Sequence, residues 1–194
     1  ATAGPEADGD PEADAEPEQP VSRLALADCK LPGVETPARC GRLEVFEDRA
    51  AASGRRIAIH VAVVPAKRRA RDADPVVVLA GGPGQGAIAL APQVVPLFAR
   101  LLETRDLVLV DQRGTGSSNP LACDSDDADG LASVFEDVLP EKLVRDCLSQ
   151  LEADPRHYAT PTAMDDLDEV LGALGYGRVN LWGGSYGTRA ALEF

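Results

Sequence analysis

Residues 179–194 read VNLWGGSYGTRAALEF, a short and largely apolar run followed by GGSYG and then by helix-favouring residues. A serine between two glycines, placed where a strand turns into a helix, is the pattern of a nucleophile elbow. Such a turn strains the backbone and presents the serine hydroxyl at the end of a sheet. Gly183 and Gly187 suit it, because a side chain at either position would collide across so tight a turn. The pattern predicts that Ser185 is a nucleophile.

Two earlier runs of four apolar residues, at 76–79 and 107–110, predict strands that are buried on both faces, as in a parallel sheet. The first run leads into the glycine-rich segment AGGPG at residues 80–84. A serine nucleophile needs hydrogen-bond donors for the oxyanion that forms during acyl transfer. We predict that these donors are the backbone N–H groups of Tyr186 and of Gly82, with Gly81 as the next candidate. A phosphate-binding loop is disfavoured, because neither G-x-G-x-x-G nor a following Lys-Ser/Thr is present.

The rest of the chain completes an α/β pattern. Residues 42–46 and 56–64 predict an antiparallel hairpin with its turn at 47–54, since apolar residues alternate along the second of these segments. Helices are predicted at 94–102, 140–151 and 160–174. Thr160 is the expected cap of the last helix and Gly175 its end. Strands separated by helices predict a mostly parallel sheet with an antiparallel N-terminal hairpin.

Composition limits the classes of partner. The chain has 194 residues, and 44% of them are hydrophobic, as expected for a globular domain. No apolar stretch approaches the roughly 20 residues that a membrane-spanning helix needs. The net charge is −13, with seven of the acidic residues and no basic residue among positions 1–20. We therefore predict a disordered acidic leader at residues 1–22. A nucleic-acid partner is not expected, because it would require a basic surface.

The four cysteines form two local pairs. Cys29 and Cys40 are 11 residues apart, and Cys123 and Cys147 are 24 apart. Neither pair has C-x-x-C spacing, and both histidines are distant in sequence, so no metal site is expected. Two disulfides are favoured over four buried free thiols, because the even number suits pairing. Disulfides imply an oxidising compartment, so we predict a secreted or periplasmic protein. A first residue other than Met fits either an exported protein without its signal peptide or a trimmed chain.

Three motifs in order create a family resemblance. They are LAGGPG at 79–84, DQRGTGSS at 111–118 and GGSYG at 183–187. Together they resemble the proline iminopeptidase and tripeptidyl aminopeptidase branch of the α/β-hydrolases, and the resemblance extends from about Cys29 to the last residue. The first cysteine pair, leading into GRLEV, is similar to exported tripeptidyl aminopeptidase-like members. Ala80 stands where proline iminopeptidases usually carry His, so the resemblance does not extend to strict specificity for an N-terminal proline.

The resemblance implies a fold and a mechanism. Residues 23–194 would form the N-terminal part of an α/β-hydrolase domain, with Ser185 as nucleophile and an Asp and then a His later in the sequence. It also implies a helical cap that recognises the free amino group of a peptide. The acid, the base and the cap would lie outside this chain, in a C-terminal half that could be a separate polypeptide. His60 and His157 precede Ser185, so the order of the triad predicts structural roles for both.

The expected function is that of an exported bacterial serine peptidase. It would release N-terminal amino acids or short peptides through an acyl-enzyme on Ser185, with no cofactor, although this chain alone would be inactive. One alternative is an esterase or lipase with the same elbow. Another is a truncated, non-catalytic fragment that acts only by binding. Asp111 and Arg113 are expected to form a structural salt bridge, and the carboxylates of residues 165–169 are read as helix N-terminal charge rather than a cation site.

Overall fold

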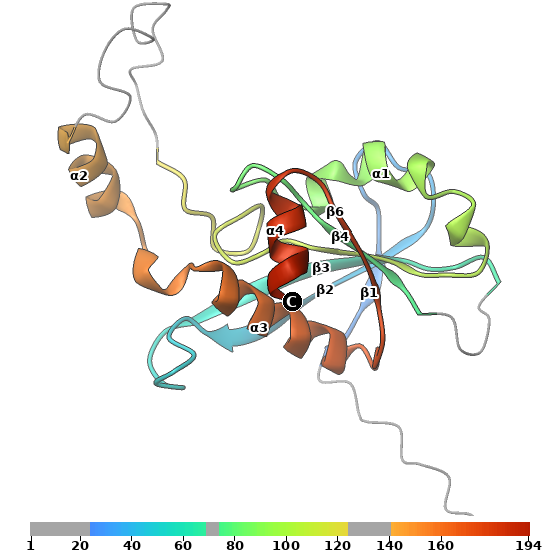
Figure 1. The fold of residues 1–194 in the computed structure, drawn as a ribbon, viewed down its shortest axis with the longest axis horizontal. Coiled ribbons are helices and arrows are strands. Elements are labelled where there is room, and N and C mark those ends of the chain that lie inside the picture. The colour runs from blue at the N-terminus through green and yellow to red at the C-terminus, as the bar shows by residue number, and fades with distance from the viewer. Residues whose placement is uncertain (1–23, 69–73, 124–140) are drawn as a thin grey trace, which may run out of the picture.

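The computed structural model describes residues 24–68, 74–123 and 141–194. In these residues six strands form one sheet in the order β1-β2-β3-β5-β4-β6 (Figure 1). The strands are β1 Ala27–Cys29, β2 Ala38–Phe46, β3 Arg56–Val64, β4 Val76–Leu79, β5 Leu107–Val110 and β6 Asn180–Gly183. The helices are α1 Ala91–Leu97, α2 Glu141–Gln150, α3 Thr160–Ala173 and α4 Tyr186–Glu193. Short 3₁₀ turns span Ile88–Leu90, Leu101–Glu103 and Pro155–His157. The predicted leader at residues 1–22 lies outside the described residues.

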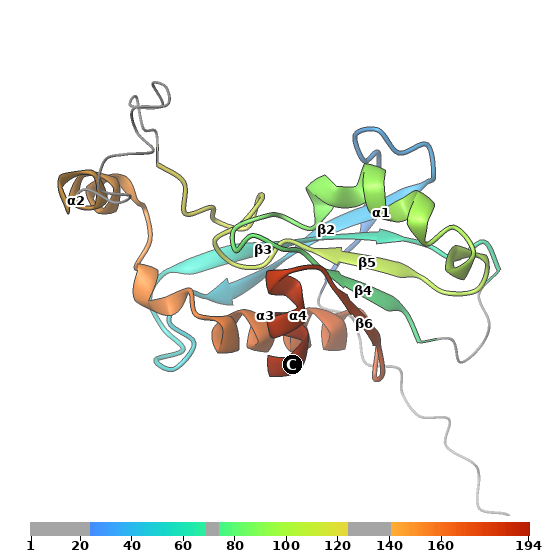
Figure 2. The same ribbon diagram turned by 45° about the horizontal axis from the view of Figure 1, so that its top comes forward.

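The sheet is the middle of three layers (Figure 2). Helix α1 covers one face, and α3 and α4 cover the other. Two apolar clusters fill the spaces between the layers. Val94 and Val95 of α1 belong to one cluster, and Leu167 and Val170 of α3 belong to the other. Burial of this apolar surface on both faces of the sheet is the main stabilising term of such a fold.

Strand directions confirm the predicted fold class. β4 pairs in parallel with β5 and with β6, as the continuous apolar runs predict. β2 and β3 form the predicted antiparallel hairpin, and β3 continues antiparallel to β5. The antiparallel part is larger than predicted, because the short strand β1 pairs with β2. The far end of β3 is buried on both faces: Val61 and Val63 join one apolar cluster, while Ala62 and Val64 join the other.

The helices differ in how well the sequence predicts them. α3 matches its predicted range to within one residue, and its backbone turns at Gly175, where φ is +80°. Thr160 is not its cap, which is a correction: the N-cap is Ala159, without a side-chain hydrogen bond. The predicted helix at 94–102 begins earlier, at Ala91, and ends at Leu97. α2 follows its predicted range, but lies away from the sheet (Figure 1), with Leu148 51% exposed.

Both predicted disulfides are present. Cys29–Cys40 joins β1 to β2, with the two Cα atoms 5.8 Å apart. Cys123–Cys147 joins the segment after β5 to α2, with a Cα–Cα distance of 5.4 Å. These bonds agree with the expectation of an oxidising compartment. None of the helices in the described part of the chain has the length and apolar character needed to cross a membrane.

Candidate active site

The turn between β6 and α4 has the geometry of a nucleophile elbow. Ser185 lies at its apex with φ 51° and ψ −120°, a conformation that a non-glycine residue adopts only under constraint. The residue is exposed, and its side chain makes no capping hydrogen bond to α4. The Gly184 N–H donates to the Leu79 carbonyl of β4 at 3.2 Å, which fixes the turn on the neighbouring strand. The hydroxyl of Ser185 is therefore held at the carboxyl-terminal edge of the sheet.

The flanking glycines are required by close packing. A Cβ at Gly183 would collide with the backbone of Gly187. A Cβ at Gly187 would collide with the carbonyl of Leu79. Both positions sit where no side chain fits, so the sequence pattern and the observed geometry have the same cause.

The glycine-rich loop after β4 lies against Ser185. A Cβ built on Gly81 would be 3.2 Å from the Ser185 Cβ and 3.8 Å from its Oγ. Gly82 has φ +106°, and Gln85 donates its N–H to the Gly81 carbonyl at 3.3 Å. β4 and β6 are parallel neighbours, so the segments that follow them meet at one edge of the sheet. The structure thus brings together Ser185, Tyr186 and the 81–82 segment, and the oxyanion role of their N–H groups stays a prediction.

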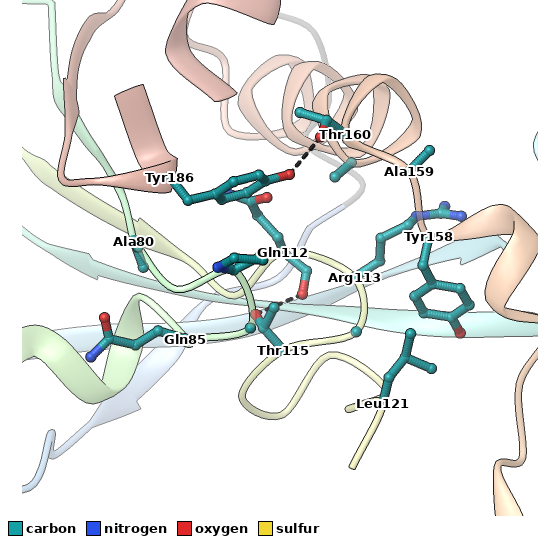
Figure 3. Close-up of a pocket in the computed structure, with 15 residues that line it drawn as sticks. Ala80, Gln85, Gln112, Arg113, Thr115, Leu121, Tyr158, Ala159, Thr160 and Tyr186 are labelled. Atoms are coloured by element: carbon teal, nitrogen blue, oxygen red, sulfur yellow. Dashed lines mark hydrogen bonds between the residues drawn. The ribbon is translucent and has the colours of Figure 1, made fainter. Parts of the chain in front are cut away.

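A cavity of about 230 Å³ opens beside this turn (Figure 3). Four parts of the chain line it: the loop after β4, the loop after β5, the start of α3 and the first residue of α4. Tyr186 forms one wall, and its hydroxyl shares a hydrogen bond with the Thr160 hydroxyl at the start of α3. The other lining residues are Ala80, Gly81, Pro83, Gly84, Gln85, Gln112, Arg113, Gly114, Thr115, Leu121, Tyr158, Ala159 and Ala163.

The loop after β5 is held by a buried carboxylate. Asp111 is 3% exposed and accepts the N–H of Ser117 in its own loop at 3.0 Å. It also accepts the N–H of Ile88 at 2.9 Å, which lies in the segment after β4. Asp111 therefore connects the two loops that border the cavity. The expected salt bridge between Asp111 and Arg113 is not found: the two Asp111 oxygens accept backbone N–H groups, and the Arg113 guanidinium binds a different carboxylate.

Arg113 instead pairs with Asp166 of α3. Its Nε lies 2.6 Å from Asp166 Oδ2 and its Nη2 lies 2.8 Å from Oδ1. Both side chains are almost fully buried, at 0% and 1% exposure. Burial raises the pKa of the Asp166 carboxyl, while hydrogen bonds and charge from Arg113 and from Arg49 act in the opposite direction. Asp166 is thus a buried partner of two arginines, which corrects its interpretation as helix N-terminal charge.

The two histidines lie away from the elbow in the fold. His60 is in β3, and β5 and β4 separate that strand from β6. His157 ends a 3₁₀ turn, with its Nε2 3.6 Å from Asp154 Oδ2, and its carbonyl accepts from Arg113. Neither belongs to the cavity lining. Within the three described ranges, no group of three or more His, Cys, Asp or Glu side chains is arranged to hold a metal ion.

Comparison with known proteins agrees with this geometry. Residues 74–194 match the family model described as alpha/beta hydrolase fold. The chain belongs to the alpha/beta hydrolase fold family. The match begins just before β4 and includes both loops and the elbow, so the family is recognised through the residues that build the candidate site.

Several curated relatives of this α/β-hydrolase chain are peptidases by name. A tripeptidyl aminopeptidase of Streptomyces lividans is 28% identical over 179 residues, which cover 84% of this chain and 33% of the relative. The serine protease Hip1 of Mycobacterium tuberculosis is 30% identical over 182 residues, covering 85% of this chain and 34% of the relative. The chain therefore spans about a third of the length of these relatives. A solved proline iminopeptidase of Mycobacterium smegmatis is 22% identical, with a TM-score of 0.48, and covers 78% of this chain and 38% of that one.

Sequence reasoning missed several residues around the cavity. Gln112 and Thr115 follow β5, and their place in the DQRGTGSS motif at a strand end was the available signal. The sequence predicts that Thr160 caps α3, but its hydroxyl contacts the Tyr186 hydroxyl instead. No sequence pattern pairs two residues that are 26 positions apart.

Proposed function

We propose that this chain carries the nucleophile and the oxyanion donors of a serine peptidase. Ser185 would attack a peptide carbonyl and form an acyl-enzyme, which water then hydrolyses. The oxyanion would be held by the N–H of Tyr186, at the start of α4, and by an N–H of the 81–82 segment. No cofactor takes part in this chemistry.

One observation carries the proposal. Ser185 is exposed and strained at φ 51°, and the backbone of Gly81 lies directly against its side chain. A serine in an ordinary strand-to-helix turn has no need of a positive φ or of a glycine-lined neighbour. The arrangement is expected where an oxyanion must fit between a nucleophile and backbone donors.

The substrate class follows from the relatives. One relative is named a tripeptidyl aminopeptidase and another a serine protease. We therefore infer peptides with a free N-terminus as substrates, released as single amino acids or short peptides. The two disulfides support export to an oxidising compartment, either secreted or periplasmic.

The proposal requires a base and an acid from outside residues 1–194, and two features of the described residues support a docking surface for the segment that carries them. β6 pairs with β4 on one side, and in the described part of the chain no strand pairs with its other side. On α4, which follows β6, Leu192 is 90% exposed. An unpaired strand edge would accept a further strand, and an exposed apolar side chain would accept a packing partner. We infer that a C-terminal segment, in the same or in a separate polypeptide, docks here and supplies the acid and the histidine.

A serine-directed fluorophosphonate probe tests the nucleophile. We expect the intact natural polypeptide that contains this chain to be labelled at Ser185, and the Ser185→Ala variant to lose labelling. Ser117→Ala is the matched control, because Ser117 is an exposed serine in the loop after β5. Residues 1–194 alone should be labelled far more slowly. Equal labelling of this chain alone would mean that its own residues supply the base, contrary to the proposal.

A substrate panel tests the reaction class. Aminoacyl and peptidyl chromogenic amides are compared with short acyl esters, and each amide is also offered with its amino group acetylated. We expect turnover of the amides with a free N-terminus and little turnover of the acetylated forms. Turnover of esters alone would identify an esterase and overturn the peptidase assignment. Absence of any turnover or labelling in the intact polypeptide would favour a fragment that acts only by binding.

A further inference from the structure

We propose that the cavity beside Ser185 is a specificity pocket for an uncharged residue of the substrate, with the Gln112 side-chain amide as its hydrogen-bonding group. The residue in question is one of the two that flank the scissile bond. This inference rests on the proposed peptidase function and adds the substrate preference of the same site. It follows from the position, size, charge and hydrogen bonding of the cavity.

The position of the cavity places it next to the reacting carbonyl. Gly81 and Tyr186 both belong to its lining. Gly81 is packed against Ser185, and Tyr186 follows Ser185 in the sequence. A carbonyl oxygen held between their N–H groups would leave one neighbouring residue of the substrate facing this space. Figure 3 shows the Tyr186 ring on one side of the space, with Gln112 and Thr115 on the loop below it.

The volume fits a single residue. Binding sites for whole drug-sized molecules measure roughly 300–1,000 Å³. This cavity measures about 230 Å³, so it accommodates one side chain rather than a tripeptide. The remaining residues of a longer substrate would have to be bound elsewhere.

Among the described residues, the cavity lining holds no charged side chain that is free to pair with a substrate. Arg113 is the charged residue of the lining, and all three of its guanidinium nitrogens are engaged, with Asp166 and with the carbonyls of Phe46, Glu47 and His157. Among the residues that the structure describes, no Asp or Glu belongs to the lining. A charged side chain that entered would lose water without gaining a counterion, which costs far more free energy than the entry of a neutral one.

Most hydroxyl groups around the cavity already have partners. The hydroxyls of Thr160 and Tyr186 bond to each other, and the Thr115 hydroxyl donates to the backbone carbonyl of Gln112. Two side-chain amides of the lining, those of Gln85 and Gln112, have no hydrogen-bond partner among the described residues. Gln85 is exposed and its side chain extends away from Gln112 and Tyr186, whereas Gln112 is only partly exposed (Figure 3). The Gln112 side chain extends from the loop toward Tyr186 (Figure 3). An amide offers both a donor and an acceptor, so it can bind a neutral polar side chain or a peptide group.

Lysine and norleucine provide the sharpest test, because they have nearly the same shape and differ in charge. Lysine or norleucine is placed in a peptide substrate either just before or just after the scissile bond. For each peptide, kcat/KM is measured with the intact polypeptide. At one of these positions we expect norleucine to be favoured over lysine by about tenfold or more. Gln112→Glu should reduce this preference by about tenfold or more, because the new carboxylate can pair with the lysine ammonium. Gln93→Glu makes the same chemical change on the exposed face of α1 and should leave the ratio unchanged.

Two results would overturn the proposal that the cavity is a specificity pocket. One is a wild-type ratio near one at both flanking positions, a measurement that does not depend on whether any variant folds. The other is an identical ratio in Gln112→Glu and Gln93→Glu. In both cases norleucine peptides would still be hydrolysed, and the peptidase proposal would stand. If the wild-type protein neither hydrolyses peptides nor reacts with a plain fluorophosphonate, the peptidase proposal itself fails, and the pocket with it.

Discussion

Two loops contain glycines and follow a buried parallel strand. The first loop, after β4, spans residues 80–87, and the second loop, after β5, spans residues 111–118. The first places the backbone of Gly81 against Ser185 and leaves space beside it. The second buries its charged side chains: Asp111 binds backbone N–H groups, and Arg113 pairs with Asp166. Two glycine-containing loops at the same edge of one sheet thus differ in what they place there: the first packs its backbone against Ser185, and the second packs buried charges into the fold.

The two loops are also coupled. Asp111 accepts the N–H of Ile88, so the loop that holds the buried charge also fixes the far end of the loop that borders Ser185. The Cβ that a side chain would add at Gly86 would lie 2.9 Å from Asp111 Oδ1, which shows how closely the segments pack. A rigid second loop is therefore a condition for a well-placed first loop.

The largest expected effect is the loss of activity in Ser185→Ala. Removing a serine nucleophile typically lowers kcat by about 10⁶-fold. Stability should change little, because Ser185 is exposed and its side chain makes no capping hydrogen bond. Peptide turnover and thermal unfolding of the intact polypeptide are compared with those of Ser117→Ala. Retention of more than a small fraction of the wild-type activity would contradict the assignment of Ser185.

The next effect concerns stability and the second loop. Asp166→Ala leaves the buried Arg113 without its carboxylate partner, so we expect the free energy of unfolding to fall by about 3–5 kcal/mol. Asp165→Ala is the matched control, since Asp165 is the neighbouring residue of the same type and is exposed. It should change stability by less than about 0.5 kcal/mol. Denaturant unfolding measures both. Equal effects of the two substitutions would show that the buried ion pair adds no stability.

A smaller effect on activity is expected from Gly81→Ala. The added Cβ would lie 3.2 Å from both the Gly184 carbonyl oxygen and the Ser185 Cβ, which displaces the loop from the nucleophile. A 1 Å misplacement of a catalytic group can cost about 10²-fold in rate. Relief of this contact needs a shift of a few tenths of an ångström, so we expect a smaller loss of rate. Gly172→Ala is the control, because no atom lies within 4 Å of the position that its Cβ would take on α3. Steady-state kinetics separates the two variants, and unchanged kcat/KM in Gly81→Ala would show that this loop does not serve the reaction.

The smallest effect is a pH dependence of stability at Asp154, which caps the 3₁₀ turn before α3. Hydrogen bonds from Arg156 lower the pKa of Asp154 from 3.8 to about 2. The folded state therefore favours the carboxylate, so this stabilisation is present above pH 3.8 and disappears as the pH falls toward 2. The Asp154 side chain is 31% exposed and solvent screens its charge, so the change in melting temperature should be small. The change in melting temperature between pH 3.8 and about pH 2 should disappear in Asp154→Asn. If Asp154→Asn loses stability in acid as much as the wild type does, Asp154 is not the cause.

Much of this fold is predictable from local patterns. β4 and β5 are runs of four apolar residues that are fully buried, so their composition alone identifies them. α3 has an apolar face with helical spacing and a glycine at its end, which together define both boundaries. The strand β1 was missed, because its three residues have no apolar pattern and are held by pairing with β2.

Only the part of the site that is built from consecutive residues can be predicted from the sequence. The turn around Ser185 is contained within five consecutive residues, and its steric requirements appear directly as glycines. The Arg113–Asp166 pair joins residues 53 positions apart, and the Thr160–Tyr186 contact joins residues 26 apart. Arg113 belongs to the DQRGTGSS motif, but the sequence does not give Asp166 as its partner, and nothing near Thr160 or Tyr186 predicts their contact. The cavity depends on four separate segments, and so only the fold reveals it.

Mapping the site of fluorophosphonate modification tests the assignment of the nucleophile most directly. The intact polypeptide is reacted at neutral pH, digested and analysed by mass spectrometry, alongside the Ser185→Ala variant. We expect one modified residue, Ser185, with no modification of Ser117 or Ser118 in the neighbouring loop. Modification at any other serine, or a fully active protein in which Ser185 stays unmodified, would contradict the proposed role of the elbow.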